Sequence, residues 1–217
     1  MQFDLIVFDW DGTLMDSTAH IVRSIQRASS DLKLPIPSRE AASHVIGLSL
    51  GKALRTACPG LSPERYHDLE DAYRHHYLCG EETVELFDGV HEGLDALRQA
   101  GALLAVATGK SRRGLDRALE VSGLSGFFDA TRTVDECHSK PDPQMLLEIT
   151  GHLGIDTQRT LMVGDTSHDL LMAVNAKAHG VGVSYGAHPL DVLQDCQPAA
   201  IFHDFPALQQ WVLPRLG

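Results

Sequence analysis

The stretch Leu5-Ile6-Val7-Phe8-Asp9-Trp10-Asp11-Gly12-Thr13 decides the fold. Four apolar residues with high β propensity are followed at once by two carboxylates and a glycine, which predicts a buried strand that ends in a turn. Residues i and i+2 of an extended chain project to the same side, so we expect Asp9 and Asp11 to face one pocket. Neighbouring carboxylates are costly unless they share a cation or one of them is protonated. A divalent metal and a proton donor are both open as solutions, and an ordinary solvated turn is the alternative for this motif taken alone.

The same arrangement of an apolar run followed by polar residues recurs along the chain. Strands are predicted at residues 5–8, 103–107, 130–133, 160–163, 181–184 and 200–202. Helical patterns lie between them, at residues 90–99, 114–122, 143–153, 170–178 and 207–213. This alternation predicts an α/β fold with a doubly wound, Rossmann-like parallel sheet. In such sheets ligands bind beyond the carboxyl ends of the strands.

One long stretch breaks the alternation. Residues 17–82 show helical patterns at 18–32, 39–45, 50–57 and 63–78, separated by prolines and glycines, and no convincing strand. We therefore expect a core domain formed by residues 1–16 and 83–217, with a small α-helical domain, residues 17–82, inserted after the first strand.

Composition limits the classes of function. The chain has 217 residues, 43% of them hydrophobic, and a formal net charge of −11 without any block of Lys or Arg, which disfavours a nucleic-acid partner. No apolar run approaches the roughly 20 residues needed to span a bilayer, and the N-terminus lacks the basic region of a signal peptide. The 4 cysteines are scattered without paired spacing, which favours reduced thiols and a cytoplasmic location.

Two further segments place phosphate-binding groups at predicted strand ends. Thr108 and Gly109 follow an apolar run and precede a helix, so a hydroxyl and free backbone N–H groups are available to a phosphate oxygen. Simple N-capping by Thr108 or Ser111 is the alternative. Lys140 stands just before two prolines in Ser-Lys-Pro-Asp-Pro, on a stiff loop where its charge could offset a phosphoryl group, although a lone lysine is most often a solvated surface residue.

Another pair of carboxylates follows the strand at residues 160–163. Asp165 ends the strand and Asp169 lies one helical turn further on, so both can face one point. Hard oxygen ligands suit Mg²⁺, whereas His168 between them is expected to be a bystander. The alternative for Asp169 is a carboxylate that favours the helix dipole.

The four segments together resemble the haloacid dehalogenase-like superfamily of aspartyl-phosphate phosphatases, over nearly the whole chain. The resemblance is carried by Asp9-Trp10-Asp11-Gly12-Thr13, Thr108, Lys140, and Gly164-Asp165 with Asp169. It is strongest to members with a helical cap after the first strand, such as phosphoglycolate phosphatases and β-phosphoglucomutases. The resemblance implies a Mg²⁺-dependent phosphoric monoester hydrolase that acts on a small phosphorylated metabolite.

The resemblance also implies a role for each residue. The carboxylate of Asp9 would attack phosphorus, and Asp11 would serve as general acid and base. The catalytic set is Asp9, Asp11, Thr108 and Lys140, and the substrate-binding set is Trp10 through its backbone N–H, Asp11, Thr108, Gly109 and Lys140. Mg²⁺ would be held by the Asp9 side chain, the Asp11 backbone carbonyl and Asp165, with Asp169 holding a water or orienting the set.

Asp11 separates the activities found among such proteins. Dehalogenases lack this second aspartate, and phosphonoacetaldehyde hydrolases replace it and use a lysine of the cap, for which Lys52 would be the candidate here. Hydrolysis of a phosphate monoester is therefore preferred, and phosphotransfer by a sugar phosphomutase is the alternative. A non-catalytic binding protein on the same fold is disfavoured because the residues that carry the chemistry are all present: Asp9, Asp11, Thr108, Lys140 and Asp165.

Overall fold

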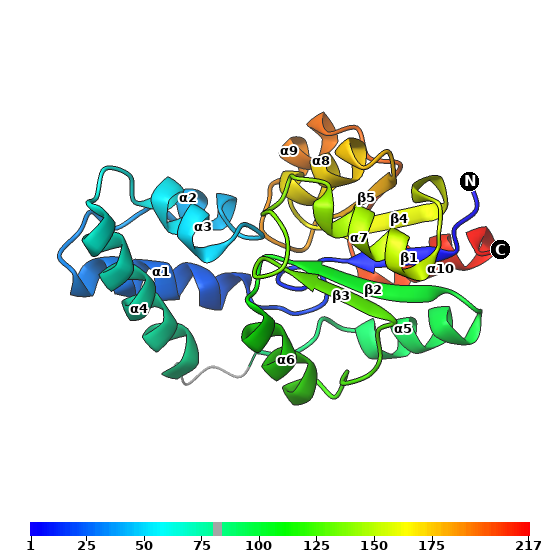
Figure 1. Ribbon diagram of the computed structural model, residues 1–217, viewed down its shortest axis with the longest axis horizontal. Coiled ribbons are helices and arrows are strands. Elements are labelled where there is room, and N and C mark those ends of the chain that lie inside the picture. The colour runs from blue at the N-terminus through cyan, green and yellow to red at the C-terminus, as the bar shows by residue number, and fades with distance from the viewer. Residues whose placement is uncertain (80–83) are drawn as a thin grey trace.

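Six parallel strands form one sheet in the computed structural model, which describes residues 1–79 and 84–217 (Figure 1). Their order in the sheet is β3-β2-β1-β4-β5-β6. The strands are β1 (Leu5–Phe8), β2 (Leu103–Thr108), β3 (Ala130–Thr133), β4 (Thr160–Gly164), β5 (His179–Val183) and β6 (Ile201–Phe202). The chain winds outward from β1 in both directions, so the doubly wound α/β prediction is confirmed. The strand order reverses between β1 and β4, which is the place where such sheets bind ligands.

Helices cover both faces of the sheet (Figure 1). On one face lie α5 (Val90–Gln99), α6 (Arg112–Val121) and α10 (Phe205–Val212), and on the other lie α7 (Gln144–Leu153) and α8 (Ser167–Asn175). Ile6 and Phe8 belong to the first apolar core, while Leu5 and Val7 belong to the second. Because both faces of β1 are buried, its sequence is a continuous apolar run without alternation.

In the part of this stretch that the structure describes, four helices lie between β1 and α5 and project beyond the carboxyl end of the sheet (Figure 1). They are α1 (Thr18–Asp31), α2 (Arg39–His44), α3 (Leu50–Ala57) and α4 (Pro63–Cys79), and we call them the helical insertion. They share an apolar cluster of their own, which includes Ile25, Leu54 and Leu69. The predicted domain boundary at residues 82 and 83 lies outside the described residues, so the division into two domains stays a prediction.

The chain enters and leaves the insertion through paired segments. The backbone N–H of Asp16 donates to the carbonyl of Glu85 at 2.9 Å, and that of Phe87 donates to the carbonyl of Leu14 at 3.0 Å. The two connections are thus held together directly beside the end of β1.

Several elements differ from the sequence prediction. Helix α8 begins at Ser167, three residues before the predicted start, because Thr166 and Asp169 form a reciprocal capping box. Strand β5 begins earlier and ends one residue earlier than predicted. The short helices α9 (Leu190–Asp195), η1 (Thr157–Arg159) and η2 (Leu213–Arg215) were not predicted, since segments of three to six residues are too short to show a helical period. Within the described ranges, no helix combines the length and the apolar character needed to cross a membrane.

Candidate active site

The register of the sheet brings the strand-end residues together. Phe8 of β1 pairs with Val106 of β2 on one side and with Val163 of β4 on the other. Asp9 and Asp165 follow these positions, and the backbone N–H of Asp9 still donates to the carbonyl of Val163 at 2.9 Å. Both aspartates are therefore fixed by the ends of neighbouring strands, as the sequence predicts.

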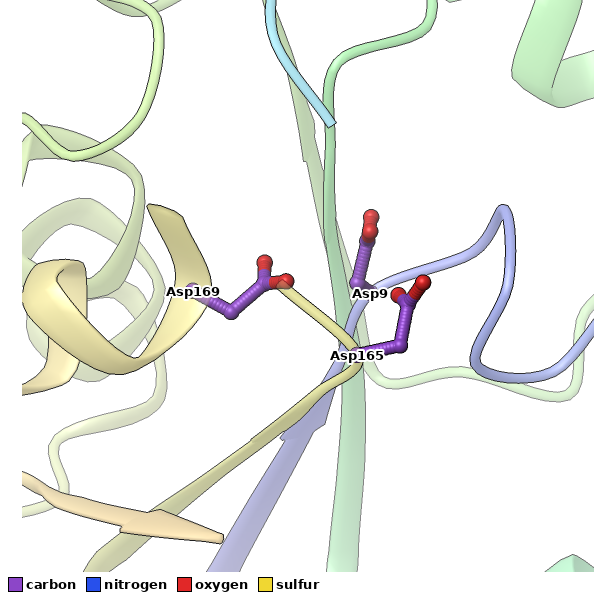
Figure 2. Close-up of side chains that lie close together, drawn as sticks. All are labelled: Asp9, Asp165 and Asp169. Atoms are coloured by element: carbon purple, nitrogen blue, oxygen red, sulfur yellow. The ribbon is translucent and has the colours of Figure 1, made fainter. Parts of the chain in front are cut away.

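Three buried carboxylates converge at this edge (Figure 2). The side chains of Asp9, Asp165 and Asp169 come from the end of β1, the end of β4 and the first turn of α8, and each offers an oxygen within 4.8 Å of the other two. The exposed fraction of each residue is 1% or less. Like charges at this spacing in a buried site require a cation or a proton.

Lys140 supplies one positive charge to the cluster. Its Nζ lies 2.7 Å from Asp9 Oδ1 and 2.6 Å from Asp169 Oδ1, and the side chain is fully buried. Burial opposes the charge, but the negative charges of Asp169 and Asp9 outweigh it and hold the pKa of Lys140 above its ordinary value. The alternative of a solvated surface lysine is therefore wrong. One ammonium against three carboxylates leaves the site short of positive charge.

Asp9 is the carboxylate most affected by this shortage of positive charge. Burial raises the pKa of Asp9 well above its usual value; Lys140 opposes this rise, while Asp169 and Asp165 add to it. Among the described residues, neither oxygen of Asp9 has a hydrogen-bond partner in good geometry, although Lys140 lies close enough to pair electrostatically. A buried, unsatisfied carboxylate of this kind is costly.

Asp165 is held rigidly on two sides. Its Oδ1 accepts from Thr13 Oγ1 at 2.8 Å and its Oδ2 accepts from the backbone N–H of Ala187 at 2.7 Å. Gly12 has a φ of +82°, and a Cβ at this position would overlap Asp165 Oδ2, so the turn after β1 requires glycine. Burial, helped by the charge of Asp169, raises the pKa of Asp165 to about 7, against the hydrogen bonds from Ala187 and Thr13.

Asp169 has a different set of partners. Its Oδ2 accepts from Thr166 N at 3.1 Å and Thr166 Oγ1 at 2.6 Å, and its Oδ1 faces Lys140. Asp169 lies in the first turn of α8, where the helix-dipole alternative places it, and it also caps the helix and pairs with Lys140. Asp9, with its unsatisfied oxygens, and Asp165 fit a hard divalent cation such as Mg²⁺, and Asp169 fits a supporting position behind them.

Asp11 turns away from the carboxylate cluster. Its Oδ1 accepts from Ser17 Oγ at 2.6 Å and lies 3.0 Å from Lys110 Nζ. Lys110 also donates to Tyr77 Oη of α4 at 2.9 Å. The sequence around Lys110 gives no sign of this ion pair, because Asp11 follows a different strand and Tyr77 belongs to the helical insertion.

The loop after β2 meets the helical insertion. Thr108 is buried at the strand end, and its Oγ1 accepts from the backbone N–H of Lys110 at 3.2 Å. Ser111, not Thr108, is the N-cap of α6. A Cβ on Gly109 would lie 2.5 and 2.6 Å from the carbonyl oxygens of Gly47 and Leu48, so only glycine permits this close approach.

The remaining predicted residues are structural in their side chains. The Trp10 indole is fully buried in the core, which leaves its backbone as the part near the site. His168 Nε2 and His188 Nε2 lie 3.0 and 3.1 Å from the carbonyl oxygen of His44, at the end of α2. His168 therefore helps to hold the insertion against the sheet, in keeping with its expected place outside the metal ligands.

Comparisons with known proteins show the family of the chain. Residues 6–183 match the family model described as haloacid dehalogenase-like hydrolase. A protein of Dickeya dadantii named probable phosphatase IndB is 38% identical over 208 residues, which cover 93% of this chain and 90% of that protein. The pyrophosphatase PpaX of Halalkalibacterium halodurans is 30% identical, with 96% of each chain covered.

A solved structure is similar over the same length. The crystal structure of a predicted phosphoglycolate phosphatase from Haemophilus somnus superimposes with a TM-score of 0.85 at 28% identity, and the match covers 97% of this chain and 98% of that one. The resemblance and the enzyme class predicted from the sequence are confirmed, and the chain belongs to the haloacid dehalogenase-like hydrolase family.

Proposed function

We propose that this protein is a Mg²⁺-dependent phosphatase that hydrolyses a small-molecule phosphate monoester through an aspartyl-phosphate on Asp9. The observation that carries the proposal is the state of Asp9. Its carboxylate is buried at the end of β1, lacks hydrogen bonds in good geometry among the described residues, and faces both a cation and two further carboxylates. A carboxylate that is poorly satisfied in the free protein is suited to act as a nucleophile.

In the first step, Asp9 attacks phosphorus and the bond from phosphorus to the leaving oxygen breaks. Asp11 gives a proton to that oxygen, so the alcohol leaves neutral. The contacts of Asp11 with Ser17 and Lys110 are both made by Oδ1, and we assign the transferred proton to Oδ2. Lys140 lies beside Asp9 and offsets the negative charge that gathers on the phosphoryl oxygens.

In the second step, water replaces the leaving group. Asp11, now ionised, takes a proton from the water as it attacks the phosphorus of the aspartyl-phosphate, and the bond between Asp9 and phosphorus breaks to release inorganic phosphate. The Thr108 hydroxyl and the backbone N–H groups of Trp10 and Gly109 are the proposed donors to the phosphoryl oxygens.

Asp9, the backbone carbonyl of Asp11 and Asp165 are the proposed Mg²⁺ ligands, with Asp169 in support. When bound, the metal would neutralise the carboxylates and draw charge from the phosphoryl oxygens. The raised pKa values of Asp9 and Asp165 support this assignment, since burial of these carboxylates without a second cation disfavours their charged form.

The helical insertion is the proposed cap that covers the substrate. Its Gly47 and Leu48 carbonyls lie against the loop after β2, and Ser49 N donates to Ser139 Oγ at 3.0 Å, beside Lys140. Such a cover favours a small substrate and excludes water during the first step. The likeness to a structure described as a phosphoglycolate phosphatase supports a substrate of that size. The cysteines are free, which supports action in the cytoplasm.

The test is phosphate release from a panel of phosphorylated metabolites, with Mg²⁺ or with excess chelator. We expect release with the metal and none with the chelator. Turnover of the same size in the chelator would refute the metal assignment. Isomerised sugar phosphate in place of free phosphate would favour the phosphomutase alternative, for which neither the site nor the reported relatives provide support.

A further inference from the structure

Lys110 places a buried ammonium at the junction of the sheet and the helical insertion. Its Nζ contacts Asp11 Oδ1 at 3.0 Å and Tyr77 Oη at 2.9 Å, and it lies 4.9 Å from the centre of the Tyr77 ring. The exposed fraction of its side chain is 11%. Holding a lysine in this way costs side-chain entropy and hydration, which the local contacts must offset.

The position of Lys110 relative to the reaction differs from that of Lys140. Lys140 pairs with Asp9, which attacks phosphorus, and with Asp169. Lys110 pairs with Asp11, which in the proposed mechanism faces the oxygen of the leaving group. Lys140 therefore serves the phosphoryl side of the site, and Lys110 lies on the leaving-group side.

The two contacts of the Lys110 ammonium described above do not use all of its N–H donors. An ammonium has three N–H donors, and the two oxygens named above account for two of them. A further oxygen can therefore bind without displacing either partner.

The wall beside Lys110 comes from α4. The rings of Tyr73 and Tyr77 stack with centres 5.7 Å apart, and Tyr77 also packs against His20 of α1, with ring centres 4.9 Å apart. These contacts fix the Tyr77 hydroxyl, so a ligand bound by Lys110 would contact the sheet and the insertion at once.

We propose that Lys110, together with the Tyr77 hydroxyl, binds an anion on the leaving group, so that the enzyme selects phosphate compounds whose leaving group bears a carboxylate or a phosphate close to the bridging oxygen. This inference rests on the proposed function and names the class of substrate. It makes Lys110 a specificity-determining residue that contacts the part of the substrate released in the first step.

The experiment compares four substrates. 2-Phosphoglycolate and inorganic pyrophosphate carry an anionic leaving group, and 2-phosphoglycolamide and ethyl phosphate carry a neutral one. Wild type, Lys110→Met, Tyr77→Phe and the matched control Arg113→Met are assayed for kcat/KM with Mg²⁺. Arg113 is exposed in the same loop–helix segment, so its replacement removes one positive charge without touching the proposed subsite.

For each variant, the loss of kcat/KM on the anionic substrates is compared with its loss on the neutral substrates. This comparison is needed because Lys110 also contacts Asp11, so its replacement can slow the reaction of every substrate. Lys110→Met is expected to lower kcat/KM for at least one anionic substrate about 10- to 100-fold more than for the neutral ones, as for a lost hydrogen bond between charged groups. Arg113→Met is expected to change all four within about threefold. Tyr77→Phe should show a smaller selective loss than Lys110→Met. A larger selective loss on 2-phosphoglycolate would indicate a site for a carboxylate, and a larger selective loss on pyrophosphate would indicate a site for a phosphate.

An equal loss on all four substrates would overturn the inference and reduce Lys110 to a positioning residue for Asp11. If the wild type releases phosphate from other metabolites of the panel but from none of these four substrates, the inference is overturned. Release from no compound of the whole panel would refute the proposed function itself, which is a different result. If Lys110→Met does not fold, the substrate preference of the wild type decides. A kcat/KM for 2-phosphoglycolate at least about tenfold higher than that for 2-phosphoglycolamide supports the inference, and equal values overturn it.

Discussion

Replacing Lys140 with methionine removes the ammonium that lies among three buried carboxylates. Its Nζ is 2.7 Å from Asp9 and 2.6 Å from Asp169, with no exposure to solvent. Removal of one partner from a buried ion pair costs about 3–5 kcal/mol, because the remaining charge is left unpaired. In a chain of this size each kcal/mol shifts the Tm by about 2–4 °C, so Lys140→Met should lower the Tm by about 6–20 °C.

The assay is thermal unfolding of chelator-treated protein, followed by circular dichroism at about pH 7.5 and again at about pH 4.5. The control is Lys177→Met, in which the same change is made at an exposed lysine and should shift the Tm by about 2 °C or less. Protonation of the unpaired carboxylates at the lower pH should shrink the deficit of Lys140→Met. Equal Tm values for the two variants at the higher pH would refute the assigned electrostatics.

Two further predictions concern the proposed metal site and the turn beside it. Asp9 and Asp165 have raised pKa values in the folded protein, so the metal-free folded protein binds more protons than the unfolded chain. Its stability therefore falls as the pH rises from the pKa of these carboxyls in the unfolded chain to their pKa in the folded protein. Mg²⁺ should therefore raise the Tm more at about pH 7.5 than at about pH 5, as measured by calorimetry, and an equal effect at both would contradict the assignment. Gly12→Ala places a Cβ on Asp165 and should lower kcat/KM by about 10²-fold through misplacement of that carboxylate. Gly101→Ala, also at positive φ but in open space, is the matched control and should keep full activity; similar losses in both would show that backbone strain alone is responsible.

The sheet was predictable from the sequence because its strands are short apolar runs that end in polar residues. The predicted bounds of residues 5–8 and 130–133 are those that the structure has for β1 and β3. For β1 the reason is that burial on both faces and a turn at the strand end leave a strong local pattern. The start of α8 was missed because it depends on the hydrogen bonds between Thr166 and Asp169, a side-chain geometry that periodicity does not report.

The candidate site was predictable to the extent that its residues stand at strand ends. Asp9, Asp165 and Asp169 converge because parallel strands end at one edge of the sheet. The pairing of Lys110 with Asp11 was not predictable, because it depends on how the helical insertion folds back and places Tyr77 against the loop after β2. A local pattern around Lys110 resembles that of any exposed lysine near a helix start.

The central claim is that phosphate is carried by Asp9 and released with the help of Asp11. Intact-mass measurement after rapid acid quench tests it directly, with an aryl phosphate whose leaving group needs no proton. In Asp11→Asn, removal of the general base should slow hydrolysis by about 10²–10⁴-fold, so that one phosphoryl group accumulates on the protein, and peptide mapping should locate it on Asp9. Asp9→Asn should show neither label nor turnover. A label on Asp9→Asn, or on a serine or threonine, would contradict the account.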